Sequence, residues 1–257
     1  MKYYLSCVLL ALITLTQAQK RIQLANITDG TFSQRSVRSV NWMNDGQYYS
    51  ALSENKVEKY EVTTGEVVET IVDGNELDIF INDYRFSADE SQVLLLTERQ
   101  SIYRRSFTAI YYVYDRSSGN SQLLSEGRQS YATFSPDGSK IAFTRDNNLF
   151  YKDLATDSEV AITTDGEFNK IINGSSDWVY EEELYITKAF EWSVDSKKLF
   201  IIGLMSATFV NTTCSFGMMP HCTHRTMCTN IQKPEKTTQS SNYMSTTLII
   251  KARFLWI

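Results

Sequence analysis

One repeat constrains the fold more than any other feature of this sequence: an aromatic residue, a tight turn and a strand-like apolar run, found four times. The aromatic residues of the four copies, separated by 44, 48 and 58 residues, are Trp42, Phe86, Phe134 and Trp192. The clearest copy is Thr133–Phe143, in which a Pro-Asp-Gly turn joins two apolar runs. Such intervals lie at or above the ~40–50 residues of a four-stranded propeller blade. The repeat therefore predicts an all-β chain that forms consecutive blades from about Arg21 to Phe200.

The segments between these copies also have the composition of strands. Tyr60–Val62 and Glu66–Ile71 flank a Thr-Thr-Gly turn and are predicted to form a hairpin, while Tyr111–Asp115 and Leu149–Leu154 are predicted to be the third strands of their blades. No long helical period competes with this pattern. The interval before Trp192 is the longest, which predicts an insertion that projects from a blade. Insertions of this kind are where a propeller carries function.

That longest interval contains the acidic segment Asp177–Leu184, in which three consecutive glutamates follow two large aromatic side chains. Ionised carboxylates are costly to pack against an apolar surface unless they stay hydrated or find a cation or several hydrogen-bond donors. One interpretation is a solvated face of a short helix, with Trp178 and Tyr180 packed beneath it. The other is a receptor for an ammonium group, because two carboxylates in an aromatic-walled recess can bind it by charge-assisted hydrogen bonds and cation–π contact. The candidate caps of this helix are Ser175, Ser176 and Asp177.

The same eight residues, Asp-Trp-Val-Tyr-Glu-Glu-Glu-Leu, resemble the glutamate motif of the dipeptidyl peptidase IV family, which belongs to the prolyl oligopeptidase clan of serine peptidases. The resemblance implies that the last two glutamates, Glu182 and Glu183, hold the free amino terminus of a peptide substrate. The bond that the enzyme cleaves then lies two residues from that end. A supporting role is implied for four other residues of the motif, Asp177, Trp178, Tyr180 and Glu181.

A second segment, Tyr103–Ala109, is similar to a motif of the same family. In that family an arginine followed two residues later by Ser-aromatic-Thr-Ala reaches toward the glutamates and binds a backbone carbonyl of the substrate. By this register the arginine is Arg104, and Arg105 is the alternative if the register is displaced by one residue. Without the resemblance, either residue would be interpreted as a surface arginine that pairs with a strand carboxylate, worth ~0–1 kcal/mol.

The catalytic groups of a serine peptidase are not found in this sequence. Nucleophilic catalysis of this kind needs a serine activated by a histidine, a carboxylate that orients the histidine, and an oxyanion hole. The chain contains no Gly-x-Ser-x-Gly segment, and its two histidines are His221 and His224. The resemblance covers roughly Ile22 to Phe200 and implies the first blades of an eight-bladed β-propeller, without the α/β-hydrolase domain. We therefore assign no catalytic residue and expect this chain to be inactive alone.

The resemblance implies that the parent protein is an exopeptidase that releases Xaa-Pro or Xaa-Ala dipeptides from the amino termini of peptides. This chain would be its substrate-recognition part. The implied partners are peptides with a free amino terminus and a C-terminal α/β-hydrolase domain, and a homodimeric parent enzyme is compatible with the family. The alternative is a non-catalytic propeller module that binds peptides or proteins. The formal net charge of −5 favours neither nucleic acid nor an anionic membrane as a partner.

The two ends of the chain are predicted to lie outside the blades. Residues 1–18 have the pattern of an export signal, with Lys2, an apolar run and a small-residue cleavage site, and are typical of a bacterial protein that is periplasmic or secreted. Residues 19–204 are then the incomplete propeller domain. Residues 205–257 contain five Lys or Arg against a single acidic residue and lack the blade pattern. We interpret them as an aberrant tail without a domain, of the kind that a frameshift produces.

Neither a cofactor nor a metal site is predicted. The tail contains residues of the types that bind zinc, namely Cys214, His221, Cys222, His224 and Cys228. Their spacing fits none of the common zinc-binding patterns, which argues against a functional zinc site.

Overall fold

The computed structural model describes residues 22–33, 38–168, 170–205 and 249–256, and it divides into two units. The described part of the first unit, residues 1–37, contains the short helix α2 (Leu24–Thr28), which buries none of its side chains. The second unit, residues 38–257, contains the strands. The prediction that blades begin near Arg21 is therefore wrong at this end. The first strand begins at Arg38, and the helix before it is held by local contacts between Gln23 and Asn26.

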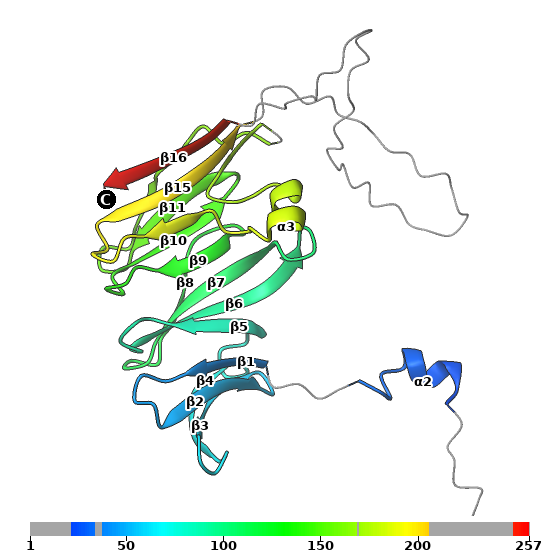
Figure 1. Ribbon diagram of the computed structural model, residues 1–257. Helices are drawn as coiled ribbons and strands as arrows, with labels where there is room; N and C mark the ends of the chain where they lie inside the picture. Colours follow the sequence, from blue (N-terminus) through cyan, green and yellow to red (C-terminus); the bar gives the residue numbers. More distant parts are fainter. Residues whose placement is uncertain (1–21, 34–37, 169, 206–248, 257) are drawn as a thin grey trace, which may run out of the picture. The chain divides into compact units, whose positions relative to one another are not determined.

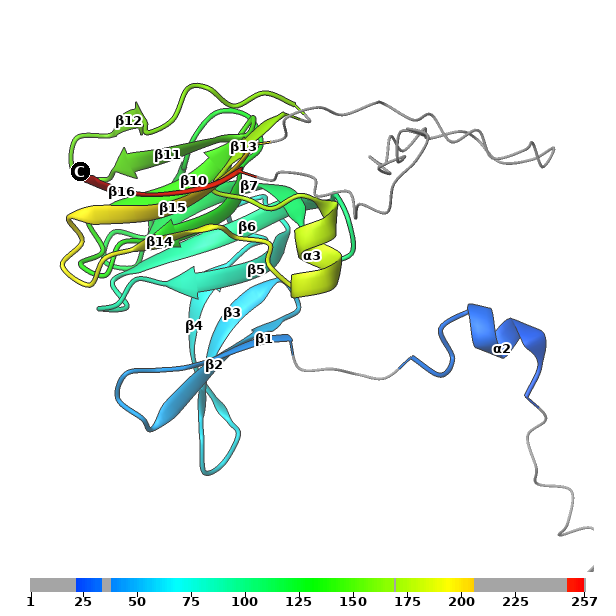
Figure 2. The same cartoon turned by 45° about the horizontal axis from the view of Figure 1, so that its top comes forward.

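Four antiparallel sheets make up the second unit (Figure 1, Figure 2). The first sheet has the order β1 (Arg38–Trp42), β2 (Tyr48–Ser53), β3 (Lys56–Glu61) and β4 (Val67–Asp73). The second has the order β5 (Ile81–Phe86), β6 (Gln92–Ser101), β7 (Phe107–Asp115) and β8 (Ser121–Leu123). The third runs from β9 (Ser130–Phe134) through β10 (Lys140–Arg145) and β11 (Asn148–Asp153) to β12 (Ser158–Ala161). This succession of hairpin-connected sheets confirms the predicted partial β-propeller.

The predicted strand pattern agrees closely with these sheets. The four marker aromatics each end the first strand of a sheet or, in the fourth sheet, the strand β14 (Phe190–Trp192). Strands β3 and β4 form the predicted hairpin, with the Thr-Thr-Gly turn between them. Residues Tyr111–Asp115 belong to β7 and residues Leu149–Asp153 to β11, which are the third strands of their sheets, as predicted.

The interior sheets bury both of their faces. In β6, Val93 and Leu95 belong to the apolar cluster shared with the first sheet, whereas Leu94 and Leu96 belong to the cluster shared with the third. All four side chains are at most 7% exposed. Successive residues of a strand point to opposite faces, so a continuous apolar run is what a strand buried on both sides requires. The run Val93–Leu96 thus packs the second sheet against both the first sheet and the third.

The marker aromatics contribute to these same interfaces. Phe86 and Phe134 pack against the clusters between their own sheet and the preceding one, and Trp192 does so in the fourth sheet. The indole nitrogen of Trp192 also donates a hydrogen bond to the carbonyl of Thr133 in the third sheet, at 3.2 Å. Trp42 lies in the first sheet, which follows no other sheet among the described residues, and its side chain is 69% exposed.

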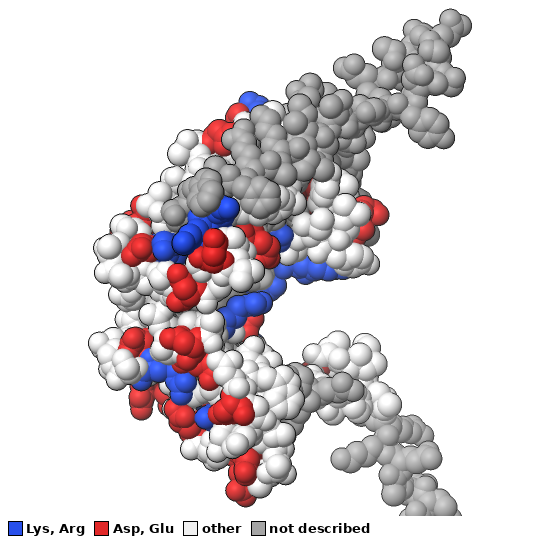
Figure 3. Space-filling model, turned by 60° about the vertical axis from the view of Figure 1, so that its left-hand side comes forward, with Lys and Arg blue, Asp and Glu red and all other residues white. Residues whose placement is uncertain are grey.

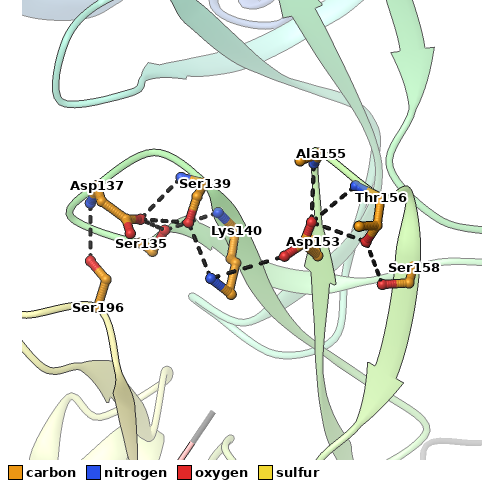
Figure 4. Close-up of polar contacts among 9 residues, drawn as sticks. All are labelled: Ser135, Asp137, Ser139, Lys140, Asp153, Ala155, Thr156, Ser158 and Ser196. Carbon is orange, nitrogen blue, oxygen red and sulfur yellow. Dashed lines mark hydrogen bonds and ion pairs between the residues drawn. The ribbon is translucent and has the colours of Figure 1, made fainter.

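The turns that follow the marker aromatics link neighbouring sheets by hydrogen bonds. In the third sheet, Asp137 accepts hydrogen bonds from the Ser135 hydroxyl at 2.6 Å and from the Ser139 amide at 3.0 Å (Figure 4). The amide of Asp137 donates in turn to the Ser196 hydroxyl of the fourth sheet at 3.0 Å. The hydrogen bond from Ser135 is the largest cause that lowers the pKa of Asp137 from 3.8 to about 2. The ionised carboxylate therefore stabilises this turn and the contact it makes.

The pH dependence of stability should report on this carboxylate. Because the folded-state pKa is depressed, its contribution is fully present above the unfolded-state pKa of 3.8 and is lost as pH falls toward about 2. We expect Asp137→Asn to lower Tm at neutral pH, and the difference from the parent protein to shrink between about pH 4 and pH 2. Thermal unfolding followed by circular dichroism across that range measures it. A difference that does not change with pH would contradict this role.

The first strand of the fourth sheet is interrupted. Strands β13 (Ile171–Asn173) and β14 both pair with β15 (Lys198–Met205), at successive positions along it. The chain leaves the sheet at Gly174 and returns at Ala189, whose amide donates to the Gly174 carbonyl at 2.9 Å. Residues 174–189 are therefore an excursion from one strand, and they contain the acidic segment. The predicted insertion is confirmed, and Figure 2 shows its helix projecting beyond the sheet.

One further strand was not predicted. Residues 249–256 form β16 (Ile249–Trp256), which pairs with β15 along its whole length and adds a strand to the fourth sheet. The prediction of a tail without a domain is therefore wrong for these residues, because they complete the edge of the fourth sheet. The candidate zinc ligands and the export signal lie outside the described residues.

The exit from the fourth sheet depends on a glycine. Gly174 has φ +77°, and a Cβ at this position would lie 3.0 Å from Thr144 Cγ2 and 3.4 Å from Leu149 Cδ1 in the third sheet. Gly65 has a similar φ of +71° with no atom within 4 Å of such a Cβ, which makes it a matched control. We expect Gly174→Ala to lower the free energy of unfolding by about 2 kcal/mol or more, and Gly65→Ala by about 1 kcal/mol. Urea unfolding measures both, and equal losses would contradict the close approach.

Candidate functional site

The acidic segment forms the helix α3 (Trp178–Leu184) at the tip of the excursion. Asp177 is its N-cap, and its carboxylate accepts a hydrogen bond from the amide of Tyr180 at 2.9 Å, so one of the three candidate caps is confirmed. The helix ends at Leu184, and its C-cap, Tyr185, has φ +59°. Trp178 is 43% exposed, and Leu184 is 57% exposed. The helix therefore does not dock by an apolar face, and another contact must hold it in place.

That contact is made by Glu181, the one buried residue of α3. Its side chain is fully buried, with 0% of the residue exposed. One carboxylate oxygen, Oε1, accepts hydrogen bonds from the amides of Arg105 at 2.5 Å and Ser106 at 3.1 Å. The guanidinium of Arg105 donates back to the carbonyl of Glu181 at 3.3 Å. A solvated acidic face is therefore excluded for this residue, because its carboxylate is buried and Oε1 is hydrogen-bonded to the protein.

The donors come from the turn between β6 and β7. These two strands contain 10 and 9 residues, whereas β10 and β11 of the third sheet contain 6 each. The longer hairpin carries its turn to α3 (Figure 1), and the turn is closed by a hydrogen bond from the Ile102 amide to the Ser106 carbonyl at 2.9 Å. Two segments that are 76 residues apart in sequence thus meet at Glu181.

The two adjacent arginines of this turn have different partners. Arg104 extends toward α3, where its Nη1 lies 3.6 Å from Oε2 of Glu182. Its side chain is 70% exposed, while that of Glu182 is 18% exposed. Arg105 instead lies over the ring of Tyr185, 4.3 Å from its centroid. The structure therefore brings Arg104 together with one of the two glutamates predicted to bind a substrate, and gives Arg105 a structural contact with the helix.

Glu183 is exposed, and its side chain makes no hydrogen bond or ion pair with another described residue. Elsewhere charges are commonly paired between loops and strands, as in the contacts of Arg116, which follows β7, with Glu69 of β4 and of Arg128, between β8 and β9, with Glu98 of β6. Figure 3 shows acidic and basic side chains intermingled on the face it presents. The carboxylate of Glu183, next to the partly exposed Glu182, is thus available to a ligand.

Two tyrosines that the sequence analysis did not identify lie close to Glu181. Burial, and then the charge of Glu181, raise the pKa of Tyr131 in β9 above its ordinary value. Burial raises the pKa of Tyr103, with smaller contributions from the charges of Asp177 and Glu181. The second oxygen of Glu181, Oε2, is buried and has no hydrogen-bond partner among the described residues. The sequence holds no signal for Tyr131, because only the fold brings β9 beneath α3.

The titration of Tyr131 offers a spectroscopic test of this arrangement. Glu181→Gln removes the negative charge but keeps the size of the side chain. We expect the pKa of Tyr131 to fall in this variant while staying above 10, because burial is the larger cause of its shift. Tyrosine-selective NMR labelling measures the titration. An unchanged pKa would show that the carboxylate does not lie near the phenol.

A family model and several known proteins are similar to this chain, and they agree with one another. Residues 87–204 match a family model described as the dipeptidyl peptidase IV (DPP IV) N-terminal region. The human prolyl endopeptidase FAP is 34% identical over 183 residues, which are 70% of this chain and 24% of that protein. A probable dipeptidyl-aminopeptidase B of Trichophyton verrucosum is 40% identical over 130 residues, 46% of this chain and 14% of that protein. The chain thus spans about a quarter or less of the length of these relatives.

A solved structure agrees with these relatives. The crystal structure of Porphyromonas gingivalis dipeptidyl peptidase 4 is similar to this chain with a TM-score of 0.68 and 37% sequence identity. The similarity covers 73% of this chain and 28% of that one. The described sheets are therefore similar in both fold and sequence to part of such an enzyme.

Proposed function

This chain belongs to the dipeptidyl peptidase IV family, whose N-terminal region it matches, and from this premise we propose that it selects peptides by their free amino terminus. In the proposal Glu182 and Glu183 bind the ammonium group, and Arg104 binds a backbone carbonyl of the same peptide. Asp177, Trp178, Tyr180 and Glu181 support the two glutamates. The whole protein would release Xaa-Pro or Xaa-Ala dipeptides, with the reaction carried out by an α/β-hydrolase domain.

The observation that carries this proposal is the contact of Arg104 with Glu182. It joins the two sequence motifs that resemble the family, from the second sheet and from the excursion of the fourth, in one exposed cluster. The Arg104 guanidinium offers donors to a carbonyl oxygen, while the Glu182 carboxylate beside it and that of Glu183, the next residue of α3, offer acceptors to an ammonium. A carbonyl and an ammonium are the two polar groups at the start of a peptide chain. Charge-assisted hydrogen bonds of this type contribute roughly 1.5–3 kcal/mol each.

We also propose where the protein acts. Lys2 and the apolar run that follows it support export to the periplasm or the exterior. Among the described residues, no helix is both long and apolar enough to cross a membrane. The proposed partners are peptides with a free amino terminus and the hydrolase domain, and the parent enzyme is proposed to form a homodimer, as is compatible with its family.

Substitution of the two glutamates tests the recognition step. For Glu182→Ala and Glu183→Ala we expect the affinity for a peptide with a free amino terminus to fall at least ~10-fold each, because each variant loses a charge-assisted hydrogen bond. Arg104→Ala should weaken binding of free and acetylated peptides alike, since the carbonyl contact is common to both. NMR titration of the chain with a proline-containing tripeptide, free or acetylated at its amino terminus, measures these affinities.

The matched control is Glu76→Ala, which removes an exposed glutamate in the turn between β4 and β5. It should leave both affinities unchanged. Where the hydrolase domain is present, kcat/KM for dipeptide release should fall at least ~10²-fold in either glutamate variant, because a misplaced amino terminus displaces the scissile bond. If the parent protein binds free and acetylated peptides equally well, the proposed recognition of the amino terminus is wrong.

A further inference from the structure

Glu181 differs from the other two glutamates of α3 in burial and in partners. It is fully buried, and its carboxylate accepts two backbone hydrogen bonds from consecutive residues, Arg105 and Ser106. A buried carboxylate is costly unless donors satisfy it, so these two bonds are what make the position tolerable. The carboxylate therefore fixes the backbone of the turn immediately after Arg104.

The side chain of Arg105 makes a second contact between the turn and α3. The Arg105 guanidinium donates to the backbone carbonyl of Glu181 at 3.3 Å and lies over the ring of Tyr185, the C-cap of α3. Residue 105 is thus held through both its amide and its side chain, and residue 181 through both its side chain and its carbonyl. We call this pair of contacts between residues 181 and 105–106 the clasp.

Arg104 has no comparable anchor of its own. Its side chain is 70% exposed, and its one ion pair among the described residues is the 3.6 Å contact with Glu182. An exposed ion pair of this length stabilises a long side chain only weakly, because ordering the side chain has an entropic cost and water screens the charges. The position of the Arg104 guanidinium is therefore determined mainly by the backbone that the clasp holds.

We propose that Glu181 is a positioning residue of the peptide site, which acts through the turn by holding Arg104 beside Glu182. The inference rests on the proposed recognition of a free amino terminus, and it assigns different roles to the three glutamates of α3. Glu182 and Glu183 contact the ligand, whereas Glu181 contacts only the protein and sets the geometry in which Arg104 and Glu182 meet. Without the clasp, α3 and the turn would each remain folded on their own sheet, but their relative position would vary.

A double-mutant comparison separates this role from a merely structural one. The 257-residue chain is prepared with Glu181→Ala, Glu181→Gln, Arg104→Ala and the combination of Glu181→Ala with Arg104→Ala, with Glu76→Ala as the exposed-glutamate control. Affinity for a tripeptide with proline at its second position is measured with a free and with an acetylated amino terminus. Hydrogen exchange of the Arg105 and Ser106 amides is measured in parallel.

We expect Glu181→Ala to weaken binding of the free peptide at least about fivefold and to speed exchange of both amides. Glu181→Gln should retain most of the affinity, because its amide oxygen can still accept the two hydrogen bonds. The double variant should bind no more weakly than the weaker of the two single variants, because both act through Arg104. If Glu181→Ala does not fold, Arg105→Ala tests the clasp from its other side, with an expected loss of about two- to threefold.

The outcomes distinguish the two proposals. Equal affinity of the parent chain for free and acetylated peptides would overturn the recognition of the amino terminus and the positioning role with it. If the parent chain prefers the free peptide and Glu181→Ala leaves the affinity for that peptide unchanged, the positioning role alone would be overturned. The same conclusion would follow if the losses from Glu181→Ala and Arg104→Ala were additive in the double variant.

Discussion

Burial of the interior sheets on both faces is the constraint on which the rest of this structure depends. Val93 and Leu95 point to one neighbouring sheet and Leu94 and Leu96 to the other, so a polar group in such a strand would lie in an apolar interface. The polar residues of the candidate site come instead from places where the chain leaves the sheets. The excursion at residues 174–189 and the extended turn between β6 and β7 are two such places, and they meet at α3.

At that junction a buried carboxylate, and not apolar packing, holds α3 against the turn between β6 and β7. The helix exposes Trp178 and Leu184 and buries Glu181, whose Oε1 accepts hydrogen bonds from two amides of the opposing turn. Hydrogen bonds of this kind are directional, whereas apolar contacts tolerate sliding. A site that must hold Arg104 and Glu182 at a defined separation gains from the directional contact. The left-handed exit at Gly174 serves the same purpose, because it sets the path of the excursion against the third sheet.

Much of this could be predicted from the sequence. The four marker aromatics end the strands they were expected to accompany, and Asp177 caps the predicted helix. The resemblance separates a supporting Glu181 from Glu182 and Glu183, but the residues alone do not show which of the three is buried, because steps of ~100° around a helix place them toward different surroundings. Glu181 is buried only because a turn from the second sheet lies opposite, 76 residues away in sequence. Tyr131 carried no local signal for the same reason, and the apolar run of β16 does not show that its partner is β15, about 50 residues earlier in the sequence.

The central claim is that Glu182 and Glu183 form the receptor for a peptide amino terminus, with Arg104 held beside them. A crystal structure of the protein with a bound proline-containing tripeptide tests it most directly. The account predicts the ammonium nitrogen within about 3 Å of a carboxylate oxygen of each glutamate, and the first carbonyl of the peptide within hydrogen-bond distance of the Arg104 guanidinium. A peptide bound elsewhere, or one whose ammonium group contacts neither glutamate, would contradict it.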